Sequence, residues 1–187
     1  TALSADIGME LWTAMIDVDN GPTSNWLLFE RGYNYDTGRI IPRGVDGESE
    51  LHPLYIGAYG DGDLPVMNDG LGIFQDVSEN IVFRDLSFPE NVGVLDASNL
   101  IFDGIATPGG RGTFQFVDGL TIRDSAFFDA VRDAPLNEGD TWDPGMNKIS
   151  GTYIGDTTGL LMEGNFYDHN GWADDYDYDL STDYGQP

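Results

Sequence analysis

A nine-residue pattern that occurs four times constrains the fold of this chain more than any other feature. The copies begin at residues 80, 99, 119 and 159 and read NIVFRDLSF, NLIFDGIAT, GLTIRDSAF and GLLMEGNFY. Their starts are 19, 20 and 40 residues apart, so the last interval is two periods or one period with an insertion. Self-similarity at a fixed period of this length predicts a solenoid of stacked repeats.

Within each copy the second and fourth residues are apolar and the fifth is charged. Residues two apart face the same side of a strand, so the pattern predicts stacked parallel strands with inward apolar columns. In strands about 4.8 Å apart, the fifth residues would form a ladder of alternating charge, each exposed pair contributing roughly 0–1 kcal/mol. The sixth residues are small or turn-forming and suit a bend. The fifth residues are Arg84, Asp103, Arg123 and Glu163, and the sixth are Asp85, Gly104, Asp124 and Gly164.

A second strand is expected before each copy, at residues 72–78, 92–98, 112–118 and 151–157. A unit of about 20 residues is too short for a crossover that carries a helix, and it predicts an all-β parallel β-helix. The alternative is an ordinary β-sandwich, but a sandwich has no reason to keep this register.

The N-terminal third of the chain carries the segments MELWTAMIDVDNGPTSNWLLFERGYNYDTGRI and LHPLYIGAYGDGDLPVM. With the repeats, they make the chain resemble bacterial pectate-lyase-like right-handed parallel β-helix proteins. The resemblance rests on Trp12, on residues 28–32 and 56–60, and on Pro65 with Val66, whereas residues 23–26 replace the usual Pro-Gly-Asp. It covers essentially the whole chain and implies a right-handed β-helix. It does not select an activity, because the superfamily includes lyases, hydrolases, epimerases, phage tailspikes and adhesins.

We expect one β-helix domain over residues 1–187. Its expected parts are an N-terminal cap (1–22), first coils (23–70), regular coils (71–172) with a loop insertion at 129–150, and an acidic tail (173–187). Residues 4–17 suit a capping helix, with Ser4 as N-cap and an apolar stripe. No comparable cap is evident at the other end, which predicts a longer β-helix or coils supplied by another chain. The stripe comprises Ile7, Leu11, Trp12, Met15 and Ile16.

The chain has 33 acidic and 8 basic residues, a formal net charge of −25, and no cysteine. This charge excludes a general nucleic-acid binder, which needs a basic footprint. The absence of cysteine excludes disulfides and thiolate metal sites. No apolar run approaches the roughly 20 residues of a membrane span. An acidic surface suits a saline or calcium-containing environment, so we expect a secreted or cell-surface protein.

The insertion at 129–150 is the first candidate site, because solenoid insertions usually lie on one binding face. Arg132 or Lys148 could stabilise developing negative charge, and Asp129 or Asp133 could transfer a proton. Trp142 could stack on a sugar ring. The alternative is a solvated loop that covers a coil edge.

The segment 167–172 begins at the last residue of the last copy and occupies the same turn as the insertion, one coil later, so the two segments should be neighbours. His169 lies beside Asp168 and could act as acid or base near neutral pH. Tyr167 and Trp172 flank it as candidate carbohydrate contacts. Alternatively, Asn170 and Gly171 simply shape the turn.

A dense acidic cluster near the end is the candidate metal site. Hard oxygen ligands suit Ca²⁺, although the segment is no EF-hand. An acidic tail without a bound ion is the alternative. The cluster comprises Asp174, Asp175, Asp177 and Asp179.

Two functions are compatible with these features. The first is an extracellular module that binds a polysaccharide and cleaves or isomerises it as a lyase, epimerase or glycoside hydrolase, with Ca²⁺ as its one expected cofactor. The second is a structural or adhesive solenoid of a surface filament or phage tailspike, assembled as a homo-oligomer or by stacking of further coils. An outward apolar column favours the second function, because exposed apolar stripes often mark interfaces. The column comprises Val82, Ile101, Thr121 and Leu161.

Overall fold

The computed structural model describes residues 4–41, 44–74, 77–132, 151–168 and 170–172. Strands dominate this part of the chain, and every pair of named strands is parallel, so the predicted all-β class with parallel sheets is confirmed. The N-terminal elements are α1 (Ala5–Met15), η1 (Val18–Asn20), β1 (Trp26–Glu30), β2 (Asn34–Tyr35), β3 (Leu54–Tyr59), β4 (Val66–Met67) and β5 (Leu71–Ile73). The others are β6 (Ser78–Arg84), β7 (Val92–Asp103), β8 (Ala106–Pro108), β9 (Gly112–Arg123), β10 (Ala126–Phe128), β11 (Val131–Arg132), β12 (Thr152–Gly155), β13 (Leu161–Glu163), β14 (Phe166–Asp168) and β15 (Gly171–Trp172).

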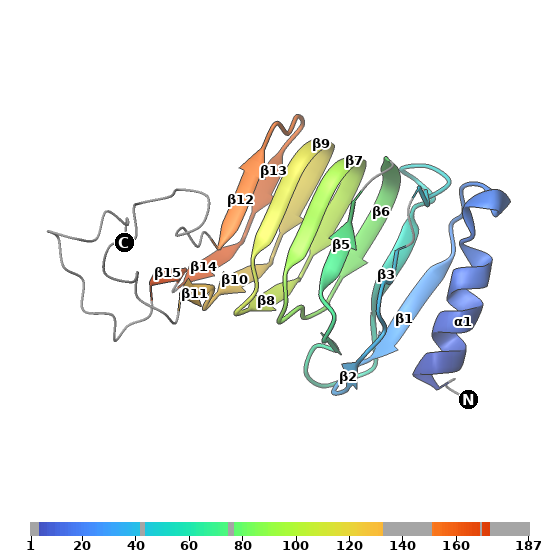
Figure 1. Cartoon of the computed structure of the whole chain (residues 1–187), viewed down its shortest axis with the longest axis horizontal. Helices are drawn as coiled ribbons and strands as arrows, with labels where there is room; N and C mark the ends of the chain where they lie inside the picture. The colour runs from blue at the N-terminus through green and yellow to red at the C-terminus, as the bar shows by residue number, and fades with distance from the viewer. Residues whose placement is uncertain (1–3, 42–43, 75–76, 133–150, 169, 173–187) are drawn as a thin grey trace, which may run out of the picture.

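The largest sheet has the order β1-β3-β6-β7-β9-β12, with β13 also paired to β9 and β5 to β7. Smaller parallel sheets join β14-β10-β8, β11-β15 and β2-β4. The strands β1, β3, β6, β7, β9 and β12 follow one another along the long axis of the molecule in the order of the chain (Figure 1). The helix α1 lies beside β1 at one end, and β12 to β15 lie toward the other end.

The repeat register predicted from the sequence is the register of the sheet. Ile81 pairs with Leu100 and Leu100 with Leu120, while Phe102 pairs with Ile122 and Ile122 with Met162. Each pair joins the same position of two copies of the nine-residue pattern. The apolar columns therefore point to one side, as the alternation of the strand requires.

Left-handed backbone marks both ends of the second strand in every repeat. The first residues of the copies have φ between 50° and 77°, and the sixth residues have φ between 50° and 66°. At the sixth position aspartate alternates with glycine because the aspartate side chain fills the space above the next repeat. A Cβ at Gly104 would lie 2.6 Å from Asp85 Oδ1, and a Cβ at Gly164 would lie 2.5 Å from Asp124 Oδ1. The expected bends are therefore confirmed, and glycine is needed at every second one.

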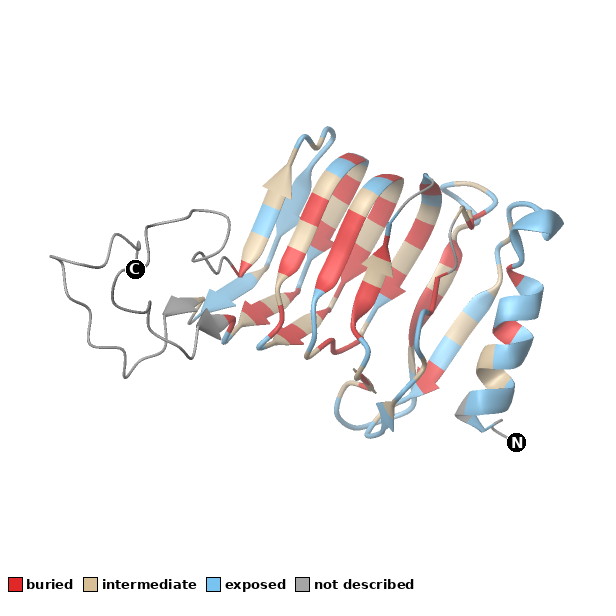
Figure 2. Cartoon of the chain, viewed as in Figure 1, coloured by how far each residue is buried: buried red, intermediate tan, exposed pale blue. Residues whose placement is uncertain are grey.

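Aromatic side chains fill the interior between the sheets. The ring of Phe102 stacks on Phe83 at a centroid distance of 5.0 Å and meets Phe114 edge-on at 5.2 Å. All three side chains are fully buried. Buried and partly exposed residues alternate along β7 and β9 (Figure 2), which is the burial pattern of strands with one inward face.

The N-terminal helix forms as predicted, but its apolar stripe is only partly covered. Trp12 and Ile16 are buried, and Trp12 Nε1 donates a 2.8 Å hydrogen bond to the Ile40 carbonyl. Three other residues of the stripe remain about half exposed: Ile7, Leu11 and Met15. Ser4 is the N-cap residue but makes no side-chain capping bond. In the described part of the chain, no helix has the length and apolarity to cross a membrane.

Candidate functional site

An open groove of about 520 Å³ lies on the outward face of β5, β7 and β9. Gly72 of β5 pairs with Gly93 of β7, which pairs with Thr113 of β9, so one outward column runs along the groove. The residues that line the groove come from these strands and from the turns just before them. They are Asp69, Leu71, Gly72, Phe74, Glu90, Asn91, Val92, Gly93, Arg111 and Thr113.

Phe74 forms the aromatic side of the groove and is 41% exposed. Its ring lies over the backbone of Gly72, where a Cβ would come within 2.7 Å of a ring carbon. The ring also covers Gly93, where a Cβ would come closer still. The two glycines therefore let a large aromatic side chain lie against the sheet.

Polar side chains form the other side of the groove, at the turns before β5, β7 and β9. Asn91 Oδ1 accepts a 3.1 Å hydrogen bond from the Arg111 backbone N–H, which ties two successive turns together. Asp69 Oδ2 accepts a 2.8 Å hydrogen bond from the Gly38 N–H. Glu90 is exposed at the same edge. The groove thus combines an aromatic ring with carboxylate, amide and guanidinium groups on a floor of small residues.

A second exposed aromatic side chain continues the same face. Tyr153 of β12 pairs with Thr113 of β9, so it belongs to the column of Gly72 and Gly93. Its ring bends over Gly155, where a Cβ would lie 2.7 Å from the tyrosine hydroxyl. Tyr153 therefore repeats, one strand beyond Thr113, the arrangement of an aromatic ring over a glycine.

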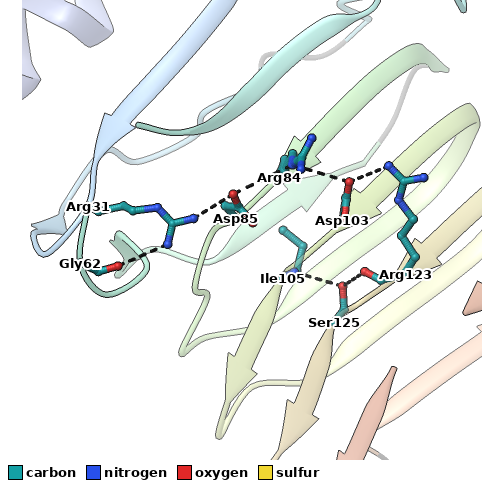
Figure 3. A network of polar contacts seen from close by, with 8 residues as sticks. All are labelled: Arg31, Gly62, Arg84, Asp85, Asp103, Ile105, Arg123 and Ser125. Atoms are coloured by element: carbon teal, nitrogen blue, oxygen red, sulfur yellow. Dashed lines mark hydrogen bonds and ion pairs between the residues drawn. The ribbon is translucent and has the colours of Figure 1, made fainter. Parts of the chain in front are cut away.

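The predicted charge ladder forms on a different strand segment and is closed by ion pairs (Figure 3). Asp103 Oδ2 lies 2.7 Å from Arg123 Nη2 and 3.7 Å from Arg84 Nε. Arg31 Nη2 lies 2.8 Å from Asp85 Oδ2. The hydrogen bond and charge of Asp103 raise the pKa of Arg123 above its usual value. These three guanidinium groups are therefore engaged with carboxylates of the chain itself.

A second groove, of about 360 Å³, separates α1 from the start of the sheet and is mainly apolar. Trp26 and Leu28 of β1 face it together with Leu11 and Met15 of the helix. The Trp26 ring also packs against Tyr55 in a tilted arrangement, with a centroid distance of 4.8 Å and an interplanar angle of 31°. Burial raises the pKa of Tyr55 above its usual value, against a smaller opposing effect of the nearby Arg84 guanidinium.

The two segments predicted to be neighbours do lie side by side. Arg132 of β11 pairs with Trp172 of β15, and the Asp129 N–H donates to the Asp168 carbonyl at 3.2 Å. Asp129 is exposed and has a left-handed φ of 59°. For Arg132 and Trp172 the description covers the backbone alone. Where the structure describes them, the backbones of the two predicted segments are therefore neighbours.

Among the residues predicted to contact carbohydrate, the structure describes the side chain of Tyr167. It stacks on Phe127 at a centroid distance of 5.3 Å and an interplanar angle of 9°, in the inward column. Burial raises the pKa of Tyr167. The other predicted site residues lie outside the described residues: Asp133, Trp142, Lys148, His169, Asp174, Asp175, Asp177 and Asp179. Among the residues that are described, no three acidic, histidine or cysteine side chains gather as a metal site.

Reasoning from the sequence missed the groove around Phe74. The available signal was glycine at outward positions of predicted strands, in GIF at 72–74 and VGV at 92–94. Glycine inside a strand often marks a close approach by another group. Here that group is an aromatic ring from the same strand region.

Comparison with protein-family models, with curated proteins and with solved structures finds no match to this chain.

Proposed function

We propose that this chain is a right-handed parallel β-helix of the pectate-lyase-like superfamily and serves as an extracellular polysaccharide-binding module. The fold proposal is supported by parallel strands in register at intervals of 19 and 20 residues and by left-handed bends at equivalent positions. The functional proposal rests on one observation, the open groove with Phe74 on one side and polar groups on the other.

The groove has the composition that a sugar chain requires. A sugar ring presents an apolar face, which packs against an exposed aromatic ring such as Phe74. Its hydroxyl groups need donors and acceptors, which Asn91, Arg111 and Glu90 supply. An open groove also accommodates a polymer, because the polysaccharide can continue on either side of the sugar units that are bound.

The proposal also includes processing of the bound polysaccharide, by a lyase, epimerase or hydrolase reaction. It assigns proton transfer to Asp129, Asp133 or His169 and charge stabilisation to Arg132 or Lys148. Additional sugar contacts are assigned to Trp142, Tyr167 and Trp172, and a Ca²⁺ site to Asp174, Asp175, Asp177 and Asp179. Its support is the pairing of β11 with β15, which brings the backbones of the two predicted segments together.

Affinity electrophoresis of the purified chain in gels that contain one polysaccharide each tests the binding proposal. We expect retardation by at least one polysaccharide and loss of that retardation in Phe74→Ala. Tyr33→Ala is the matched control, because Tyr33 is an exposed aromatic residue that does not line the groove. Migration that no polysaccharide changes would refute binding. Release of reducing ends or unsaturated products from the retained polysaccharide then tests processing.

The structural or adhesive solenoid is the second candidate, and the last repeat supports it. Three residues of the inward columns are exposed there: Leu160, Met162 and Tyr167. They form an apolar surface on which another coil could pack. Sedimentation velocity across a concentration series tests this function. A defined oligomer or fibre that disperses in Met162→Asp would favour it, whereas a monomer at all concentrations would refute self-assembly.

A further inference from the structure

We infer that the groove binds an uncharged linear glycan of several sugar units, held between the rings of Phe74 and Tyr153. This inference rests on the proposed polysaccharide-binding function and adds the class of sugar and the extent of the binding surface. It comes from three features of the described residues: the charges at the groove, the strand register between the two rings, and the chemistry of the floor between them.

The charge at the groove disfavours an acidic glycan. Among the described residues that line the groove, the two carboxylates of Asp69 and Glu90 outnumber the one guanidinium, that of Arg111, by one negative charge. The whole chain carries a formal charge of −25, so a polyanion is also repelled over longer distances. Arg84 and Arg123 are already paired with Asp103 on another strand segment. A glycan without carboxylates avoids these repulsions.

The two aromatic rings are spaced for an oligosaccharide. Phe74 follows β5, and Tyr153 lies on β12, three strand steps away through β7 and β9. With neighbouring strands about 4.8 Å apart, β5 and β12 are about 14 Å apart, and β7, which the Phe74 ring covers at Gly93, is about 10 Å from β12. One monosaccharide cannot touch both rings, but a chain that runs across the strands can. Binding should therefore strengthen abruptly at the length that reaches the second ring.

The floor between the rings presents small, apolar and neutral polar groups. Gly93 and Thr113 form one outward column, and Leu95 and Gln115 form the column beside it. The hydroxyl of Thr113 and the amide of Gln115 can each donate and accept hydrogen bonds, as sugar hydroxyl groups can. No charged residue occupies these four positions, which is consistent with an uncharged ligand.

Isothermal titration calorimetry of the full chain tests the inference. The probes are linear β-1,4-linked gluco- and manno-oligosaccharides from disaccharide to hexasaccharide, with oligogalacturonates and oligomannuronates of matched length. We expect a neutral series to bind with a step in affinity at an intermediate length, and uronates to bind at least about tenfold more weakly. Added salt should strengthen uronate binding, because it screens repulsion, and leave neutral binding unchanged.

Substitutions in the groove test whether the ligand binds between the two rings. Phe74→Ala and Tyr153→Ala should each lower the affinity for the longest neutral probe about tenfold, as loss of an aromatic anchor typically does. Gly93→Ala keeps both rings but forces the Phe74 ring off the sheet, and it should weaken binding as well. Tyr33→Ala should bind as the unchanged chain does. A thermal unfolding curve for each variant shows whether the fold is retained.

Each outcome separates this inference from the proposed function. Uronates that bind as tightly as neutral probes, or a uronate affinity that falls with salt, would overturn the uncharged ligand and leave polysaccharide binding in place. Neutral binding that Phe74→Ala does not change would overturn the groove, and a normal affinity in Tyr153→Ala would overturn the two-ring surface. No binding of any oligosaccharide, together with no retardation by any polysaccharide, would refute the proposed function itself.

Discussion

The middle repeats (99–107 and 119–127) and the last repeat (159–167) carry equivalent residues in very different surroundings. Phe102 and Ile122 are 0% exposed, whereas Met162, in the same column, is 41% exposed. Leu120 is likewise fully buried and Leu160 is 45% exposed. The last repeat appears largely exposed beside the buried stripes of β7 and β9 in Figure 2. Residue type is apolar in both, so burial here comes from having a neighbouring repeat on each side.

The largest expected effect comes from truncating a side chain of the same inward column, once in a middle repeat and once in the last repeat. Phe102→Ala should lower the free energy of unfolding by about 3–5 kcal/mol, because it removes a fully buried ring between Phe83 and Phe114. Met162→Ala should cost about 1 kcal/mol or less, because that side chain is already partly in water. Urea denaturation measures both.

A similar cost for the two substitutions would contradict the difference in burial between the middle and last repeats. It would mean that the last repeat is covered in solution as fully as the middle ones. Sedimentation of the unchanged chain at the same concentration would then show whether a second copy provides the cover.

Glycine at the sixth position should show the opposite behaviour, with equal costs in the middle and at the end. Gly104 and Gly164 both have left-handed φ, and each lies under an aspartate of the preceding repeat. Alanine at either position should cost about 1–2 kcal/mol, the penalty of a left-handed backbone for a residue with a Cβ. Unequal costs in denaturation would indicate that the following repeat also matters. Introduced into Asp85→Ala, Gly104→Ala should cost less than it does in the unchanged chain, because the clash with the carboxylate is absent.

The charge ladder should again distinguish the two regions, with a smaller effect. Asp103 lies between Arg84 and Arg123 and is 7% exposed, whereas Glu163 is exposed at the end of the ladder. Asp103→Asn should lower the free energy of unfolding by about 1.5 kcal/mol, because a charge-assisted hydrogen bond is lost. Glu163→Gln should change it by less than about 0.5 kcal/mol. Denaturation at low and high salt checks the origin, since the Asp103→Asn cost should shrink as salt screens the charges.

The sequence contains the register of this fold because the register repeats. Two periodicities, of two residues along a strand and about twenty between strands, were sufficient to predict the inward columns, the ladder of Arg84, Asp103 and Arg123, and the bends. They also predicted that the segments around Asp129 and Asp168 would be neighbours. All of these features depend on the alignment of equivalent positions.

Features that depend on the conformation of a single side chain could not be predicted from the repeats. The groove exists because the Phe74 ring folds back over Gly72 and Gly93, and the repeat pattern does not specify this side-chain conformation. The apolar stripe predicted which face of the helix would point inward, yet Leu11 and Met15 stay about half exposed beside the groove between α1 and β1. Periodicity predicts which face points inward, but not how much of that face its neighbour covers.

The smallest expected effect is a gain in stability. It concerns a position at which one middle repeat has a different type of residue from the other repeats. Asp96, Phe116 and Asp156 occupy equivalent bends, and all three have left-handed φ, between 48° and 60°. Aspartate tolerates this conformation, whereas it is an outlier for a bulky aromatic residue. Phe116 is also 51% exposed, so its burial does not offset the strain. Phe116→Asn should therefore raise the free energy of unfolding by about 1 kcal/mol.

Thermal and urea denaturation of Phe116→Asn, beside Asp156→Asn as the matched substitution at the last repeat, check this expectation. Asp156→Asn should leave stability nearly unchanged, because both residues accept left-handed backbone. A loss of stability in Phe116→Asn would show that the ring makes contacts that outweigh its strain. A gain in stability together with weaker binding of the longest neutral oligosaccharide would instead indicate that the strained ring is retained as a ligand contact, since backbone strain tends to persist where function requires it.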